Sequence, residues 1–241
     1  KYGGTIPEIL AYLEKITAEL DTLENADDRR EELREQYRGM LAEAKGIAAE
    51  LTEQRRKAAK QLEGEIVREL SELDMDKVKM RVAVRTGTKL SAHGCDTVTF
   101  EISVNPGEPE KPLSKVASGG ELSRIMLALK NVLTAGEDVG MLIFDEIDTG
   151  VSGKIAEKMA MIMEEMGAGG RQVISITHLP QIASRGLHHY KVEKTDTPEG
   201  TESHMRQLSA DERVGEIAMM LSGENVTEAA LENARALLST H

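Results

Sequence analysis

Two acidic residues follow a short apolar strand, and they are the first candidates for chemistry in this sequence. Residues 141–144 are Met-Leu-Ile-Phe, and Asp145 and Glu146 come directly after them. Ligands of α/β proteins usually bind at the carboxyl ends of strands. There, one carboxylate can hold Mg²⁺ through water while the other orients or deprotonates an attacking water. The pair suits a magnesium–nucleotide site, but solvated acids at an ordinary strand end would have the same sequence.

A glycine turn that opens a predicted helix is the second candidate, at Ser118, Gly119, Gly120 and Glu121. A serine N-cap with a glutamate three residues later is a capping box, which explains the pattern without any ligand. Two glycines at the first helical positions, however, weaken a helix start. They also bare the backbone amides at the positive end of the helix dipole, which makes an anion site. The glycines therefore favour a phosphate that comes close to this turn.

A histidine and a polar loop complete the set. Residues 172–176 are predicted to form a strand, and Thr177 and His178 follow it. If this strand lies beside residues 141–144, the imidazole of His178 can bond a γ-phosphate or the attacking water. A capping role is the simpler alternative. Asp148 begins the loop of residues 148–153, which also fits an ordinary turn and helix cap.

The phosphate-cradling loop that would complete an ATP site is missing. Its pattern is G-x-x-x-x-G-K-[ST], in which backbone amides and the lysine hold the β- and γ-phosphates. The nearest stretch, GVSGKI at residues 150–155, has the wrong spacing and no hydroxyl after the lysine. The motifs therefore predict half of an ATP site.

Composition narrows the class of protein. The chain has 241 residues, 30% of them charged, and a net charge of -12, so it does not read as a stand-alone nucleic-acid-binding protein. Cys95 is the only cysteine, which permits no internal disulfide. No apolar run reaches membrane-spanning length. The start, KYG, has no initiator Met and no signal-peptide pattern, so we expect a piece of a longer chain.

The sequence from about Thr5 to Leu73 predicts a long helix with a narrow apolar seam. An arm of a coiled coil is the favoured interpretation, and an amphipathic helix packed on its own domain is the alternative. The seam is interrupted at residues 25–28, and its members, at spacings of four and three, are Ile9, Leu13, Ile16, Leu20, Leu23, Leu33, Tyr37, Met40, Ala44, Ile47 and Leu51. Arg55, Arg56, Lys57 and Lys60 form a basic cluster, either a solvated face or a contact to a DNA backbone.

Beyond residue 77 the pattern predicts an α/β fold. Apolar residues alternate with polar ones at 78–84 and again at 98–104, which predicts two antiparallel strands. Apolar strands then alternate with helices, which favours a parallel sheet. The predicted helices are 120–134, 153–166, 210–221 and 227–239, and the further strands are 141–144, 172–176, 190–193 and 203–208.

Three motifs in this order carry a family resemblance: ASGGELSR at 117–124, FDEIDTG at 144–150 and ITHLPQ at 176–181. Together they resemble the C-terminal part of proteins of the RecN family. These are bacterial DNA repair proteins related to the structural-maintenance-of-chromosomes (SMC) ATPases. The opening KYG, RRKAA at 55–59 and VNPGE at 104–108 also look like this family. The resemblance thus covers essentially the whole chain. Each short motif is shared by many ABC-type ATPases, whereas their combination is specific.

The resemblance implies a fold: the C-terminal half of an ABC-type ATPase head, of the P-loop NTPase superfamily, preceded by a long coiled-coil helix. The implied domains are a coiled-coil arm at 1–75 and the C-terminal lobe of the head at 76–241. In this family a long antiparallel coiled coil separates the two halves of the head, and the N-terminal half carries the phosphate loop. A missing loop and an unpaired seam are then expected.

The resemblance also implies roles for the motif residues. The signature residues 118–121 would contact ATP held by a second head. Asp145 would hold Mg²⁺ through water, and Glu146 would be the catalytic base. His178 would sense the γ-phosphate, and Asp148 would lie in a loop that crosses the head–head interface.

The function implied is that of an ATP-hydrolysing factor in DNA repair and recombination at double-strand breaks, in the bacterial cytoplasm at the nucleoid. Its partners would be the N-terminal half of the same head, a second head in a homodimer, and DNA, with no membrane. The chain alone is expected to be inactive. The alternatives are another SMC-like ATPase of chromosome maintenance, a non-enzymatic coiled-coil interaction module, and an ABC transporter subunit, against which the helical arm argues.

Overall fold

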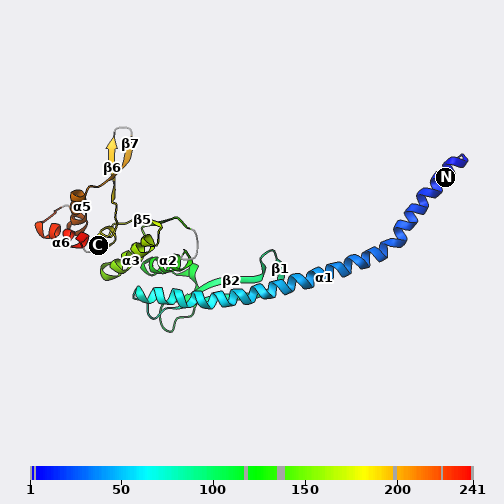
Figure 1. The fold of residues 1–241 in the computed structure, drawn as a ribbon, viewed down its shortest axis with the longest axis horizontal. Coiled ribbons are helices and arrows are strands. Elements are labelled where there is room, and N and C mark those ends of the chain that lie inside the picture. The colour runs from blue at the N-terminus through cyan, green and yellow to red at the C-terminus, as the bar shows by residue number, and fades with distance from the viewer. Residues whose placement is uncertain are drawn as a thin grey trace. The chain divides into compact units, whose positions relative to one another are not determined.

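The computed structural model describes residue 2 and residues 4–116, 119–134, 139–197, 200–223 and 225–239 (Figure 1). Every predicted helix and strand is present, with bounds that differ by a few residues, except that the first strand ends at Ser91 and not at residue 84. Three short elements, at residues 111–112, 113–115 and 180–183, were not predicted. The elements are α1 (Ile6–Glu72), β1 (Lys79–Ser91), β2 (Gly94–Ser103), β3 (Lys111–Pro112), the 3₁₀ helix η1 (Leu113–Lys115), α2 (Gly119–Thr134), β4 (Met141–Asp145), α3 (Gly153–Ala168), β5 (Gln172–Ile176), α4 (Pro180–Ala183), β6 (Tyr190–Thr197), β7 (Gly200–Gln207), α5 (Ala210–Ser222) and α6 (Glu228–Ser239).

Two compact units make up the chain, and each is described by itself. The first comprises residues 1–58 and 84–98, and the second comprises residues 59–83 and 99–241. The helix α1 and the strands β1 and β2 have residues in both units. The units are therefore not divided at a single position of the sequence, and the predicted boundary after residue 75 stays a prediction.

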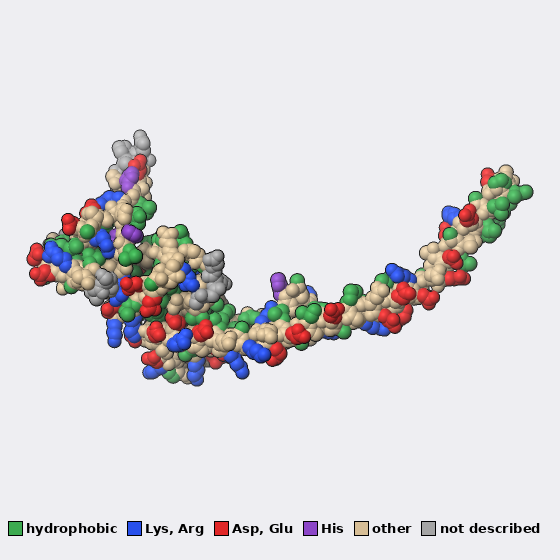
Figure 2. Space-filling view, viewed as in Figure 1, with side chains coloured by type: hydrophobic (Ala, Val, Ile, Leu, Met, Phe, Trp, Pro, Cys, Tyr) green, Lys and Arg blue, Asp and Glu red, His purple; other side chains and the backbone are tan. Residues whose placement is uncertain are grey.

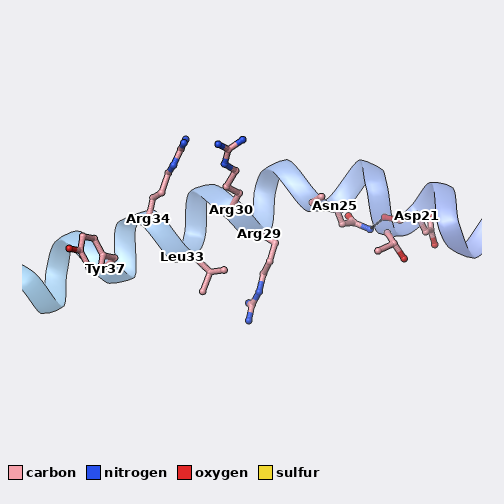
Figure 3. Close-up of a pocket in the computed structure, with 9 residues that line it drawn as sticks. Asp21, Asn25, Arg29, Arg30, Leu33, Arg34 and Tyr37 are labelled. Carbon is pink, nitrogen blue, oxygen red and sulfur yellow. Dashed lines mark hydrogen bonds between the residues drawn. The ribbon is translucent and has the colours of Figure 1, made fainter.

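The first unit is dominated by the exposed part of α1. This helix continues through residues 25–28, where the apolar seam is interrupted, and the large seam residues on both sides of the interruption are exposed. Around the interruption the side chains of α1 line an open groove of about 800 Å³. Figure 3 shows Arg30 and Arg34 on one side of the helix and Arg29 and Leu33 on the other. A narrow apolar seam flanked by charges is typical of a coiled-coil helix.

The tip of the β1–β2 hairpin is held on α1 by a polar cluster, which we call the hairpin anchor: Thr52, Arg55, Thr86 and Asp96. The carboxylate of Asp96 accepts hydrogen bonds from Thr52 Oγ1 (2.9 Å), Thr86 Oγ1 (2.9 Å) and Arg55 Nη1 (3.0 Å). Arg55 also donates to the carbonyl of His93 at 2.9 Å. Burial raises the pKa of Asp96, but the hydrogen bonds from Arg55, Thr86 and Thr52 together lower it by more. The pKa is therefore below its ordinary value.

The hairpin anchor changes the interpretation of the basic cluster. The guanidinium of Arg55 is bound by Asp96 and its side chain is 27% exposed, whereas Arg56 lies 2.7 Å from Glu53 in an exposed ion pair. Exposed pairs of this kind contribute little to stability. Arg55 is therefore neither a merely solvated residue nor a ready contact for a DNA phosphate.

The main core lies in the second unit, where the end of α1 packs with α2, β4 and α3. Its fully buried members include Ile66, Leu70, Ile125, Leu127 and Met159. A smaller core joins α5 and α6 through Ile217, Ala218, Ala230 and Ala234.

The strands β4 and β5 pair in parallel, as the sequence predicted. Leu142 and Phe144 are buried against the main core, but Met141 and Ile143 are 48% and 62% exposed. Within the described residues, β4 is therefore buried on one face only. The next two strands, β6 and β7, form an antiparallel hairpin and belong to a separate sheet.

Candidate active site

The acidic pair lies at one edge of the β4–β5 sheet together with residues 177–179, which we call the histidine loop. In the parallel register Asp145 is opposite Ile176, so the residues that follow each strand emerge together. The backbone N–H of Glu146 donates to the carbonyl of Ile176 at 3.1 Å, one residue before Thr177. The predicted neighbourhood of the carboxylates and His178 is confirmed. Asp145, Glu146 and His178 are all exposed and free to meet a ligand.

Glu146 has an unusual backbone conformation. Its φ is +49°, in the left-handed region that residues other than glycine rarely adopt. The conformation turns the chain sharply at the strand end, where the N–H of Thr149 returns to the carbonyl of Glu146 at 3.1 Å. Strained backbone of this kind concentrates at functional sites. We call residues 145–150 the motif loop.

Asp148 is the buried member of the motif loop, with a side chain only 1% exposed. Its Oδ2 accepts a short hydrogen bond from Thr177 Oγ1 and a second from the backbone N–H of His178 at 3.2 Å. His178 Nδ1 lies 3.3 Å from the same oxygen. The motif loop and the histidine loop are thus joined by one carboxylate. The sequence singled out both segments but not this contact.

The two glycines of the signature turn have different surroundings. A side chain on Gly120 would place its Cβ 2.5 Å from the carbonyl oxygen of Gly150, so the packing of α2 against the motif loop already requires glycine there. Gly119 is exposed and has nothing within 4 Å of such an atom. The prediction that both glycines admit a phosphate is thus weakened for Gly120 and stands for Gly119. Ser118, the predicted N-cap, lies outside the described residues.

Two further signature residues flank the glycines. Glu121 is half-buried in the first turn of α2. Arg124 Nε donates to the carbonyl of Gly120 at 3.1 Å, and its Nη1 donates to the carbonyl of Leu73 at 3.1 Å. Arg124 therefore ties the start of α2 to the segment that follows α1. Its place inside the signature motif was the only hint of this role in the sequence.

The residues at the sheet edge fit a magnesium ion that is held mainly by water and by the phosphates of a substrate. Among the described residues, no group of three or more His, Cys, Asp or Glu side chains could enclose a metal. Mg²⁺ is often bound by one or two carboxylates, several waters and the phosphates of a substrate. The exposed carboxylate of Asp145 at the strand end suits this mode and no other.

Comparison with known proteins finds relatives of one name but no family model. No model of a known family matches the chain. The chain is 40% identical over 253 residues to the DNA repair protein RecN of Bacillus subtilis, covering 99% of this chain and 44% of that protein. It is 41% identical over 239 residues to the DNA repair protein RecN of Deinococcus radiodurans, covering 99% of this chain and 42% of that protein. The chain thus spans less than half the length of these relatives.

Solved structures give the fold. The Smc head domain with a coiled coil and joint from Pyrococcus yayanosii matches with a TM-score of 0.55 and 17% identity, covering 92% of this chain and 39% of that chain. A structure from work on ATP-driven dimerization and DNA-stimulated activation of SMC ATPases matches with a TM-score of 0.50 and 16% identity, over 72% of this chain and 99% of that chain. In the described part of the chain, no helix is long and apolar enough to cross a membrane. The chain has the fold of part of an SMC-type ATPase head, and its sequence relates it to the RecN proteins and is consistent with their C-terminal portion.

Proposed function

We propose that this chain supplies the hydrolytic half of an ATP site in a DNA repair factor. The observation that carries the proposal is the parallel register of β4 and β5, with Asp145, Glu146 and His178 at one edge of the sheet. Ligands of open α/β sheets bind at such edges. The left-handed backbone of Glu146 supports the same site, because strained backbone is found often at functional sites.

Each exposed group at this edge has a separate task. Asp145 would hold Mg²⁺ through water, and the ion would neutralise charge on the phosphates. The carboxylate of Glu146 would accept the proton of the attacking water. The imidazole of His178 would bond the γ-phosphate or that water. Gly119, open in front of the backbone amides of α2, would admit the phosphate of ATP held by a second head.

The exposed face of the β4–β5 sheet supports a partner that completes the head. Met141, Ile143, Ile174 and Ile176 lie on this face, and each is between 39% and 62% exposed. Parallel sheets are usually covered on both faces. The N-terminal half of the same head, with the phosphate loop, is the partner that we propose for this surface.

The relatives' names support a biological setting for this proposal. The relatives are called DNA repair proteins, and one neighbouring structure concerns ATP-driven dimerization and DNA stimulation of SMC ATPases. We extend this to a homodimer of heads that sandwiches ATP, acts on DNA at double-strand breaks and works at the bacterial nucleoid. ATP would stabilise the dimer, and hydrolysis would release it.

The proposal is tested by measuring ATP hydrolysis by this chain alone and after mixing with the separately expressed N-terminal half of a RecN protein, with and without linear DNA. We expect turnover only in the mixture. Glu146→Gln should lower it by roughly 100-fold or more, because it removes a general base. Glu157→Gln, on the exposed start of α3, is the matched control and should leave turnover unchanged. Unchanged turnover in Glu146→Gln refutes the assigned base, and silence in every mixture favours a coil-based binding module.

A further inference from the structure

The described hydrogen bonds of the Asp148 side chain all lead to the histidine loop. We infer that Asp148 is a positioning residue that fixes the orientation and the tautomer of His178, so that Nδ1 faces the protein and Nε2 faces the ligand. The consequence for catalysis rests on the function proposed above. The orientation itself does not, because it follows from geometry in the chain alone.

One oxygen of Asp148 accepts two hydrogen bonds from consecutive residues and lies beside the ring of the second. Thr177 Oγ1 and the backbone N–H of His178 both donate to Oδ2, and the ring Nδ1 of His178 lies 3.3 Å from it. Thr177 Oγ1 in turn accepts from the backbone N–H of Leu179 at 3.0 Å. The backbone on both sides of the ring is therefore held, while the side chain of His178 remains 67% exposed. A fixed backbone with an exposed ring is what a ligand-sensing histidine needs.

The arrangement is not explained by stability. The other oxygen of Asp148, Oδ1, is buried and has no hydrogen-bond partner among the described residues. A buried polar atom without a partner costs about 1–3 kcal/mol. An uncompensated group of this kind in a native structure calls for another explanation, and function is one. Asn at this position could place its amide oxygen at Oδ2 and keep the same acceptor, but without the negative charge.

The position of the carboxylate decides what His178 can do. A neutral imidazole carries one proton, and an acceptor beside one nitrogen holds the proton on that nitrogen. With the proton on Nδ1, the exposed Nε2 is an acceptor. It then accepts from the attacking water, and it donates to a phosphate oxygen only when the ring is fully protonated. The sequence left these two roles of His178 open, and the contact with Asp148 distinguishes them.

The test is a direct measurement of the His178 tautomer. The ring nitrogens of the ¹⁵N-labelled chain are recorded by long-range ¹H–¹⁵N correlation at about pH 8.5, where imidazoles are mostly neutral. His178→Gln identifies the signal by its loss. We expect the proton on Nδ1 in the native chain and on Nε2 in Asp148→Ala. A proton on Nε2 in the native chain overturns the inference without any variant of Asp148.

Two further variants separate a positioning role from a folding role. Asp148→Asn keeps an acceptor, so it should retain the Nδ1 proton even if Asp148→Ala fails to fold. Thr149→Ala is the matched control, because Thr149 is an exposed neighbour whose Oγ1 donates only to the carbonyl of Glu146, at 2.9 Å. It should leave the tautomer unchanged. A proton that moves to Nε2 in Thr149→Ala as it does in Asp148→Ala, or that moves to Nε2 in a folded Asp148→Asn, contradicts the inference.

The mixture that tests ATP hydrolysis supplies the last measurement. Asp148→Ala should lower kcat by roughly tenfold or more with little change in KM, and Asp148→Asn should recover part of the loss. If the native mixture hydrolyses no ATP but the Nδ1 proton is present, the proposed function fails and the positioning contact stands. If the mixture hydrolyses ATP and the proton is on Nε2, only the positioning role fails.

Discussion

The hairpin anchor in the first unit and the motif loop in the second each contain a buried aspartate, and the two residues are used differently. Asp96 has both oxygens occupied, by two threonine hydroxyls and the guanidinium of Arg55. Within the described residues, the hydrogen-bond partners of the Asp148 side chain are all on one oxygen, and the other oxygen has none. One carboxylate is satisfied by a permanent cation, whereas the other is paired with a histidine whose ring is exposed.

The difference distinguishes scaffolding from function. Every group of the hairpin anchor lies in a helix or a strand and has an ordinary partner. The motif loop instead has a left-handed Glu146, an unpartnered oxygen on Asp148 and a glycine-to-glycine backbone contact at Gly150. Irregularities of this kind are costly and persist where a site needs them. The charges on the surface of the chain (Figure 2) do not reveal this distinction, because both aspartates are buried.

The largest effect is expected where the motif loop meets α2. Gly120→Ala should destabilise the second unit by about 1–3 kcal/mol or more, because the new Cβ would overlap backbone rather than a flexible side chain. Gly119→Ala, one residue away in open space, should be neutral or stabilising by up to about 1 kcal/mol through helix propensity. Urea unfolding of the two variants compares them directly. Equal losses would mean that the close approach to Gly150 is not what requires the glycine.

A smaller effect is expected in the hairpin anchor. Thr52→Val removes one hydroxyl from Asp96 and should cost about 1 kcal/mol, confined to the hairpin tip. Hydrogen exchange of residues 84–98 should accelerate, while that of α2 stays unchanged. Thr52→Ser keeps the hydroxyl and is the matched control. ATP turnover of the reconstituted mixture should be unaffected, and a large loss there would end the distinction between the two regions.

The strain at Glu146 predicts a gain in stability. Glu146→Gly removes the penalty of the left-handed conformation, offset in part by the greater entropy of the unfolded chain, so we expect a net gain of up to about 1 kcal/mol. Glu146→Gln keeps the strain and should have the stability of the native chain. Both variants should lose ATP turnover. A Glu146→Gly chain that is less stable in urea than Glu146→Gln would mean that the side chain of Glu146 contributes to folding.

These contrasts also explain what the sequence predicts and what it does not. Strands and helices follow from hydrophobic periodicity, and the sheet edge follows because residues after parallel strands emerge together. Three contacts join segments far apart in the chain: those of Asp148 with Thr177, of Gly120 with Gly150 and of Arg124 with Leu73. No local pattern encodes such contacts. One feature was visible and missed: Ser209 followed by Glu212 has the spacing of a capping box, and the structure has one there.

The smallest of the expected effects on stability comes from this capping box. Its carboxylate, on Glu212, differs from those of Asp96 and Asp148 because it is exposed and yet strongly hydrogen-bonded. The pKa of Glu212 is lowered to about 2, mostly by the hydrogen bond from the backbone N–H of Ser209 and to a lesser extent by those from the Ser209 hydroxyl and Arg206. A carboxyl whose pKa is lower in the folded state stabilises the fold above its ordinary pKa, near 4.3, and the benefit is lost as the pH falls toward 2. The protection factors of the α5 amides, in which the intrinsic pH dependence of exchange is divided out, should therefore fall in this window relative to pH 7. Glu212→Gln should show a smaller fall in protection, and identical profiles of protection against pH would mean that the bonds of the capping box do not persist in solution.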